Sequence, residues 1–312
     1  MSTQDNRDKN QGDKNQVETT GHVWDENLQE YNNPLPRWWL WGFYATVVFA
    51  LVYWLIYPAW PIGDTFTKGF ATITYEVDGE ERTTHWNTRA LLARDMQTGE
   101  YAVRQREMLE QVAAQDYETI LADADSMSFV NAYAQGSFGT WCAACHQVGG
   151  AGVIGQYPNL RNDHWKWGGT VDQIEQTIRE GRLGYMPGYR NTLSSDQLNE
   201  VAAYVLALND YDVDADMADA GERIFTGMEG GCFQCHGEEG QGLASQGAPN
   251  LTNNLWGLID VPGAESDSER LRLVSNFIRD GIQREMPGFA DRLSDDEIKM
   301  LTAYVHSLGG GQ

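Results

Sequence analysis

Two pentapeptides constrain this chain more than any other feature: Cys142-Ala-Ala-Cys145-His146 and Cys232-Phe-Gln-Cys235-His236. Both read C-x-x-C-H, the attachment sequence for a c-type haem. Two thiols three positions apart lie on one helical turn, so each can form a thioether to the porphyrin, and the histidine that follows lies below the iron as its proximal ligand. The chain has four cysteines, and the two motifs use all of them.

C-x-x-C pairs also occur in dithiol redox sites and zinc ribbons, but neither needs a histidine directly after the second cysteine. A zinc site made from both pairs would have to close across the 86 residues between Cys145 and Cys232, well beyond ribbon spacing. Zinc and dithiol chemistry remain the alternatives. We expect two covalently bound c-type haems, attached through Cys142, Cys145, Cys232 and Cys235, with His146 and His236 as iron ligands.

The charge of the chain is unusual, whereas its hydrophobic fraction is that of an ordinary globular protein. It carries 45 acidic and 22 basic residues, for a formal net charge of -23. Such acidity argues against nucleic acid as a partner. The length of 312 residues leaves room for two or three small domains.

Residues 38–57, WWLWGFYATVVFALVYWLIY, contain no charge. A helix of that length crosses about 30 Å of hydrocarbon, and the tryptophans and tyrosines at its two ends are typical of membrane interfaces. A signal peptide has a shorter apolar core near the terminus, whereas this run begins after 37 mostly polar residues and is not followed by a small-residue cleavage site. We predict one uncleaved span rather than a signal peptide or a buried core helix.

The orientation of this span follows from charge and from haem chemistry. More basic residues precede the span than lie within twenty residues after it, which favours a cytoplasmic N-terminus; they are Arg7, Lys9, Lys14 and Arg37 before it and Lys68 after it. Bacteria attach c-type haem on the periplasmic side, so residues 58 onward should face the periplasm. We therefore expect a single-pass protein of the bacterial inner membrane.

The second half of the chain is an internal repeat. Ile178-Arg179-Glu180-Gly181 recurs as Ile278-Arg279-Asp280-Gly281, and Met186-Pro187-Gly188 recurs as Met286-Pro287-Gly288, each at an offset of 100. Pro158-Asn159-Leu160 recurs as Pro249-Asn250-Leu251 at an offset of 91. After Ser194 and Ser294, a glutamine or glutamate three residues later predicts a capping box, and apolar residues follow at helical spacing. Each copy should end in an amphipathic helix.

The order C-x-x-C-H, P-N-L, M-P-G and closing helix resembles the class I cytochrome c domain. The resemblance implies an all-α fold, with one transmembrane helix followed by two such domains, and Met186 and Met286 as the sixth iron ligands. By default each methionine serves the haem of its own copy, although two packed copies could exchange these loops. Iron held by histidine and methionine has no open position, which implies electron transfer rather than substrate activation.

His164 is the rival sixth ligand, because it lies between haem motif and methionine in the first copy. The second copy has Leu255 there, and leucine cannot bind iron. We expect His164 to be a surface or haem-edge residue. His22, His85 and His306 have no counterpart in the repeat and should not be ligands.

The N-terminal stretch at residues 21–39, GHVWDENLQEYNNPLPRWW, leads into one span and then two haem domains. This arrangement is similar to the dihaem subunit, subunit III, of cbb3-type cytochrome c oxidases. The resemblance implies a non-catalytic electron-transfer subunit of a proton-translocating oxidase. It would accept electrons from a soluble or membrane-bound cytochrome c and pass them toward the monohaem subunit and the catalytic haem-copper subunit, where oxygen is reduced to water.

The expected domains are a cytoplasmic tail (1–37), the transmembrane helix (38–57), a periplasmic helical linker (58–125) with a helix over 88–121, and cytochrome c domains at 126–209 and 210–312. An acidic run at residues 210–219 is either a solvated linker or a docking surface for a basic electron donor, and the overall acidity also suits a high-salt habitat. Two other functions stay open: a dihaem carrier for a different enzyme, such as a dehydrogenase or nitric oxide reductase, and a dihaem peroxidase-like enzyme.

Overall fold

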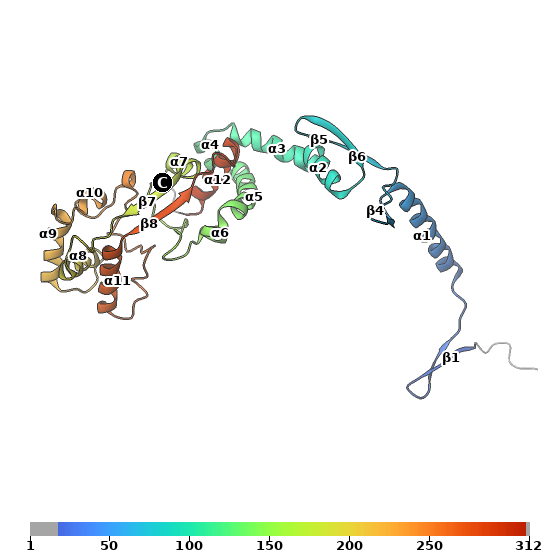
Figure 1. Cartoon of the computed structure of the whole chain (residues 1–312), viewed down its shortest axis with the longest axis horizontal. Helices are drawn as coiled ribbons and strands as arrows, with labels where there is room; N and C mark the ends of the chain where they lie inside the picture. Colours follow the sequence, from blue (N-terminus) through green and yellow to red (C-terminus); the bar gives the residue numbers. More distant parts are fainter. Residues whose placement is uncertain (1–17, 310–312) are drawn as a thin grey trace, which may run out of the picture. The chain divides into compact units, whose positions relative to one another are not determined.

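The computed structural model describes residues 18–309. The chain divides into two compact units, residues 1–103 and residues 104–312. Figure 1 shows the order of helices and strands along the chain. The predicted cytoplasmic tail lies partly outside the described residues, and Arg7, Lys9 and Lys14, on which the predicted orientation depends, are among those outside.

The described part of the first unit, residues 18–103, combines three short antiparallel hairpins with two complete helices. The hairpins join β1 to β2, β3 to β4 and β5 to β6. In chain order the elements are β1 (Thr19–Trp24), β2 (Leu28–Tyr31), α1 (Arg37–Ile56), β3 (Pro61–Ile62), β4 (Thr65–Phe66), β5 (Thr72–Val77), β6 (Glu80–His85) and α2 (Thr88–Thr98).

Helix α1 matches the predicted apolar helix with a shift of one residue. Pro36 precedes its first turn, and Tyr57 is extended, as the ring of Pro58 after it favours. None of its side chains is buried within the protein. Among the described residues it is the one helix long and apolar enough to cross a membrane. Its apolar surface therefore needs a lipid or protein environment.

The expectation of an all-α fold is confirmed only in part, because strands accompany the helices. The hairpin β5–β6 lies within the segment predicted as a helical linker, and its strands pair from Thr72 opposite His85 to Val77 opposite Glu80. Asp78 and Gly79 form the turn with positive φ values of 53° and 81°. An Asp-Gly pair suits such a two-residue turn, because its twist matches that of the strands.

The helix predicted over residues 88–121 is three helices: α2, α3 (Glu100–Ala113) and α4 (Tyr117–Ala122). The first break is at Gly99, which is extended. The second is before Asp116, whose carboxylate accepts a hydrogen bond of 2.7 Å from the backbone N–H of Thr119 and so caps α4. Aspartate favours this cap over a position inside a helix, because it satisfies an N–H left free at the helix start.

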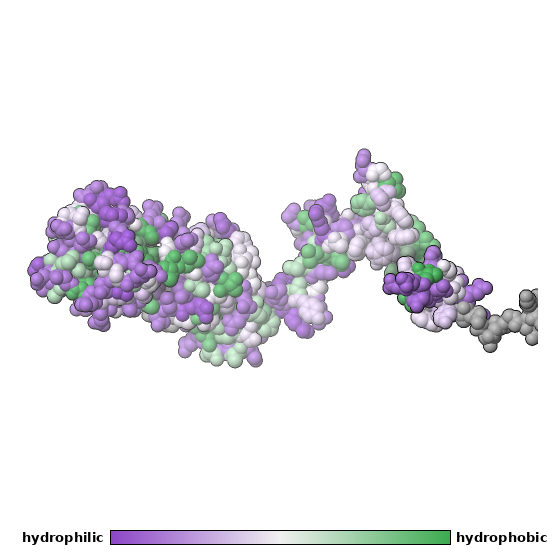
Figure 2. All heavy atoms as spheres, turned by 90° about the horizontal axis from the view of Figure 1, so that it is seen from below, coloured by the Kyte–Doolittle hydropathy of each residue, from purple (hydrophilic) through white to green (hydrophobic). Residues whose placement is uncertain are grey.

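The second unit contains both copies of the repeat. Figure 2 shows that hydrophilic side chains cover most of its visible face, with smaller apolar patches between them. The first copy contains α5 (Ala124–Trp141), α6 (Ala143–His146), α7 (Val171–Glu180), β7 (Gly181–Met186) and α8 (Ser195–Ala207). The second contains α9 (Ala215–Thr226), α10 (Phe233–His236), α11 (Asp267–Asp280), β8 (Ile282–Pro287) and α12 (Asp295–Ser307).

Both predicted capping boxes are confirmed. The Ser194 hydroxyl accepts from the backbone N–H of Gln197, while the Gln197 side chain accepts from the backbone N–H of Ser194. Ser294 and Glu297 form the same reciprocal pair at the start of α12. The two closing helices therefore begin where the sequence predicts.

These closing helices are exchanged between the copies. One core, called the Cys142 core below, packs Phe138 of α5 and Ile174 of α7 against Leu301 of α12. The other, the Cys232 core, packs α8 of the first copy against Phe225 of α9 and Val274 of α11. The predicted boundary between residues 209 and 210 separates the sequence copies, but each core contains helices from both.

A two-stranded ribbon connects the cores. Strands β7 and β8 run side by side in opposite directions, with Gly181 opposite Pro287 and Met186 opposite Ile282 (Figure 1). Because the copies are offset by 100 residues here, the ribbon is nearly symmetric about the pair Gly184 and Arg284. Each chain segment thus leaves one core along the ribbon and enters the other.

Glycines permit this crossing. Gly181 and Gly281 have φ values of 77° and 66°, which favour glycine. A Cβ on Gly281 would lie 2.5 Å from the backbone N of Gly188 and from the carbonyl O of Met186. Beyond each methionine, the backbone N–H of Tyr189 donates to Ile278 O at 3.1 Å, as Phe289 does to Ile178 O at 3.0 Å. Each methionine loop is therefore tied to a helix end of the other copy.

Candidate haem sites

Each C-x-x-C-H motif forms a single helical turn. In the first, the backbone N–H groups of Cys145 and His146 both donate to the Cys142 carbonyl, at 3.1 and 2.9 Å. The second motif repeats these bonds at 3.2 and 2.9 Å around Cys232. The first cysteine of each motif is half-buried and the second is exposed. One turn thus presents two thiols and a histidine in the order that haem attachment needs.

A backbone carbonyl orients each histidine. Nδ1 of His146 lies 3.0 Å from the carbonyl O of Pro158, and Nδ1 of His236 lies 3.1 Å from that of Pro249. A carbonyl can only accept, so Nδ1 carries the proton and Nε2 keeps the lone pair that binds metal. The proline of the repeated P-N-L motif therefore fixes the ring of the histidine in its own copy.

The asparagine of that motif shapes the same loop. Asn159 Oδ1 accepts from the backbone N–H of Arg161 at 2.8 Å, and Asn250 Oδ1 accepts from that of Thr252 at 2.8 Å. Side-chain bonds to the backbone two residues ahead are typical of Asx turns. Both copies thus hold the proline carbonyl with the same local bond.

Burial sets the protonation of these groups. It lowers the pKa of His146 and of His236, partly offset by the bond to the proline carbonyl, so both rings are neutral at pH 7 and can act as ligands. Burial and the neighbouring Cys145 raise the pKa of the Cys142 thiol to about 11. This thiol is therefore protonated near neutral pH.

The methionines lie in the cores opposite to those of the default expectation. Met286 of the second copy packs against the Cys142 core, and Met186 of the first copy packs against the Cys232 core. We expected each methionine to pack beside the C-x-x-C-H motif of its own copy, and the packing contradicts this: each lies against the core that contains the motif of the other copy. The reason is the ribbon, which carries each M-P-G loop across to the other core.

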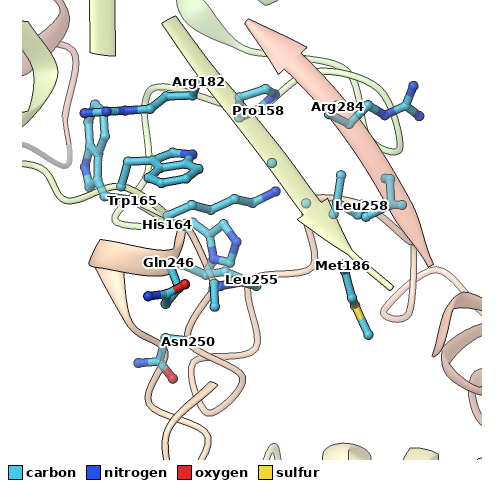
Figure 3. A pocket seen from close by; sticks show the side chains of 18 of the residues that line it. Pro158, His164, Trp165, Arg182, Met186, Gln246, Asn250, Leu255, Leu258 and Arg284 are labelled. Carbon is cyan, nitrogen blue, oxygen red and sulfur yellow. The ribbon is translucent and has the colours of Figure 1, made fainter. Parts of the chain in front are cut away.

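One cavity of about 740 Å³ contacts both motifs. Its lining includes the four cysteines, His146, His236, Met186 and Met286, together with apolar side chains from both cores. Figure 3 shows Met186 at the end of β7, with His164 and Trp165 on the other side of the cavity. The structure thus brings all eight predicted site residues to one internal space.

The lining fits an apolar group with carboxylates at its edge. Three cations face the cavity, Lys166, Arg182 and Arg284, against a single acid among the described lining residues, Glu285. Basic residues thus outnumber acidic ones in the cavity lining, whereas acidic residues outnumber basic ones in the whole chain. The indole Nε1 of Trp165 is buried and has no hydrogen-bond partner among the described residues. Haem c has the required features: a flat apolar ring, two propionates, and an iron for the histidine and methionine.

His164, the rival ligand, lines this cavity. Burial and the nearby Lys166 lower its pKa to about 4, so it is neutral at pH 7. Its role as a haem-edge residue stays a prediction. His22, His85 and His306 do not line the cavity.

Sequence reasoning missed the cations and Tyr189. The hydroxyl of Tyr189 lies near Cys232, and burial raises its pKa to about 12, whereas the other copy has Phe289, which packs edge-on against Trp141. Lys166 corresponds to Gly257. Differences between the two copies are the sequence signal that identifies these residues.

The acidic run has partly structural roles. Asp214 accepts a hydrogen bond of 2.9 Å from the backbone N–H of Met217 and caps α9, and Asp216 lies in the first turn, where negative charge is favourable. Residues 215–219 of the run therefore belong to helix α9, and the linker interpretation applies at most to the residues before it. Donor docking remains a prediction.

Comparisons with known proteins agree with this geometry. Residues 16–64 match the family model described as the N-terminal domain of cytochrome oxidase-cbb3, FixP. Residues 132–205 and 216–305 match the model described as cytochrome c oxidase, cbb3-type, subunit III. The matches include the N-terminal stretch and both copies of the repeat.

Curated relatives match over nearly their whole length. The cbb3-type cytochrome c oxidase subunit FixP of Azorhizobium caulinodans is 37% identical over 303 residues, covering 94% of each chain. The cbb3-type subunit CcoP of Cereibacter sphaeroides is 35% identical over 305 residues, covering 94% of this chain and 95% of that protein. The chain therefore belongs to the subunit III family of cbb3-type cytochrome c oxidases.

Proposed function

We propose that this chain is the membrane-anchored dihaem electron-transfer subunit of a cbb3-type oxidase. One haem c is bound through Cys142 and Cys145, and the other through Cys232 and Cys235. The axial ligands are exchanged between the copies: His146 pairs with Met286, and His236 pairs with Met186.

The observation that carries this proposal is the composition of the two cores. Each core joins a C-x-x-C-H turn of one copy with the methionine of the other, around a shared cavity. Haem c, when bound, supplies one-electron exchange between ferric and ferrous iron. The histidine and methionine side chains would hold the iron of a bound haem c on both sides, which would leave no coordination site for oxygen or peroxide.

The remaining lining controls the environment of the iron. The proline carbonyls lock the two histidine rings, and the apolar side chains exclude water. A thioether ligand and burial both favour ferrous iron, which suits a carrier late in a respiratory chain. Oxygen reduction and proton pumping then belong to other subunits.

The same proposal assigns partners and orientation. The haem domains face the periplasm and the N-terminus faces the cytoplasm. The chain accepts electrons from a cytochrome c donor and passes them toward the monohaem subunit and the catalytic haem-copper subunit. Its support is the apolar helix α1, the family membership and the periplasmic attachment of c-type haem.

Purification from native membranes with haem typing tests this function. The expected result is a chain whose mass includes two haems, recovered together with b-type haem and copper. Recovery without b-type haem and copper would assign the chain to another enzyme. Carbon monoxide binding by the reduced, isolated subunit would show an open iron and would favour the peroxidase-like class instead.

A further inference from the structure

Lys166 differs from the other two cations of the cavity. Arg284 donates to the carbonyl O of Gly155 at 2.9 Å. Arg182 donates to Thr177 Oγ1 at 2.9 Å and stacks over Trp167, 5.1 Å from the ring centroid. Within residues 18–309, the Lys166 ammonium has no hydrogen-bond acceptor or ion-pair partner. A half-buried ammonium without a counter-ion is costly, so its anion should come from a ligand.

The indole N–H of the neighbouring Trp165 also lacks a hydrogen-bond acceptor among the described residues. Trp165 Nε1 is buried without an acceptor among the described residues, although its counterpart Trp256 donates to Asn254 Oδ1 at 2.7 Å. The first copy has Asp163 at the position of Asn254, and its carboxylate does not accept from Trp165. Two adjacent donors, Trp165 and Lys166, thus face one cavity with no protein acceptor.

The second copy cannot form this pair. Gly257 stands where the first copy has Lys166, and the N–H of Trp256 is already used. Since Trp165 packs against the Cys142 core, the pair lies beside the first haem site. The two haem sites are therefore inequivalent in charge although their motifs are the same.

We propose that Trp165 Nε1 and Lys166 Nζ together bind one propionate of the haem attached at Cys142 and Cys145. This assignment rests on the proposed function. A cation held at the propionate offsets its negative charge and favours ferrous iron, which raises the potential of this haem above that of the haem attached at Cys232 and Cys235.

The potential order gives a direction for electron flow. Electrons that enter at the Cys232 site would move to the higher potential at the Cys142 site. The donor side of the chain would then be the second haem, and the oxidase side the first.

Redox titration of full-length variants tests the pair. Met186→His and Met286→His backgrounds each remove one sulfur-to-iron absorption band, so the remaining band reports a single haem. In the Met186→His background, which reports the Cys142 haem, Lys166→Met should lower the reduction equilibrium constant about tenfold, or about 59 mV. Trp165→Phe should lower it by a smaller factor. In the Met286→His background both shifts should be absent.

Arg272→Met is the matched control, because Arg272 is exposed on α11 and is not part of the cavity lining. It removes one positive charge and should shift neither haem. A Lys166→Met shift that is absent, reversed, or equal at both haems would overturn the inference. Haem content is measured separately: fewer than two haems per wild-type chain would refute the proposed function instead.

Discussion

Replacing Gly281 by alanine tests the β7–β8 ribbon, through which each copy passes its methionine loop and closing helix to the core of the other copy. Gly281 has a φ of 66°, and a Cβ there would lie 2.5 Å from Gly188 N and from Met186 O. Gly184 of the same ribbon is the matched control: it has no positive φ, and the nearest atom to its Cβ would be Arg284 O at 3.8 Å. The two substitutions add the same methyl group to one ribbon in different surroundings.

The expected cost follows from two effects. Gly281 has a φ of 66° and a ψ of -172°, a region that is essentially restricted to glycine and costs another residue about 1–3 kcal/mol. Overpacking against rigid backbone adds about 1–3 kcal/mol, because backbone atoms cannot move aside as a side chain can. Gly281→Ala should therefore lower the free energy of unfolding by about 2–6 kcal/mol, whereas Gly184→Ala should change it by about 0.5 kcal/mol or less.

Denaturant unfolding of the full-length haem protein in detergent, followed by far-ultraviolet circular dichroism, measures both variants. Because Gly281 abuts the Met186 carbonyl, the sulfur-to-iron band of the Cys232 haem should also disappear at lower denaturant in Gly281→Ala than in the wild type. Equal stability of the two variants would refute the close approach at this crossing. A loss confined to the Cys142 haem would refute the assignment of Met186 to the Cys232 core.

Three further predictions concern other parts of the chain. Lys299 donates to the carbonyls of Ala113 at 2.7 Å and of Gln115, so Lys299→Met should cost about 1–3 kcal/mol of unfolding free energy, and an unchanged midpoint in denaturant would contradict these bonds. His164 has its pKa lowered to about 4, so the unfolded chain binds a proton below pH 6.5 that the folded chain does not. From pH 7 to pH 5 the wild type should thus lose about 2 kcal/mol more stability than His164→Gln, and equal losses would contradict the burial of His164. If the acidic run at residues 210–219 docks a basic donor, the rate of reduction by that donor should fall severalfold as ionic strength rises from about 0.01 to about 0.15 M, and a flat response would leave the run as a linker.

Local sequence signals predicted the parts of the fold that depend on neighbouring residues. The capping boxes at Ser194 and Ser294, the apolar helix before Tyr57 and the turns at Cys142 and Cys232 all form near their predicted positions. The β5–β6 hairpin was not predicted, although its Asp-Gly turn follows a strand, Thr72–Val77, in which polar and apolar residues alternate, and these two signals identify it. The helix predicted over residues 88–121 forms as α2, α3 and α4, whereas the strands between residues 61 and 85 were not predicted.

The exchange between copies could not be found in the same way. The distance along the sequence from each methionine to the preceding C-x-x-C-H motif does not depend on which core the methionine joins. Which core it joins is decided by the long-range pairing of β7 with β8. The role of Pro158 was hidden for a similar reason, because its carbonyl contacts His146 across a loop. Lys166 was missed because it has no counterpart in the repeat.

The proposed pairing of each histidine with the methionine of the other copy can be tested directly in a variant that keeps one haem. Cys142→Ser with Cys145→Ser removes the first attachment site and leaves the haem at Cys232 and Cys235. In this background, Met186→His should abolish the remaining sulfur-to-iron band, and Met286→His should leave it intact. Loss of the band with Met286→His and its retention with Met186→His would contradict the exchanged arrangement.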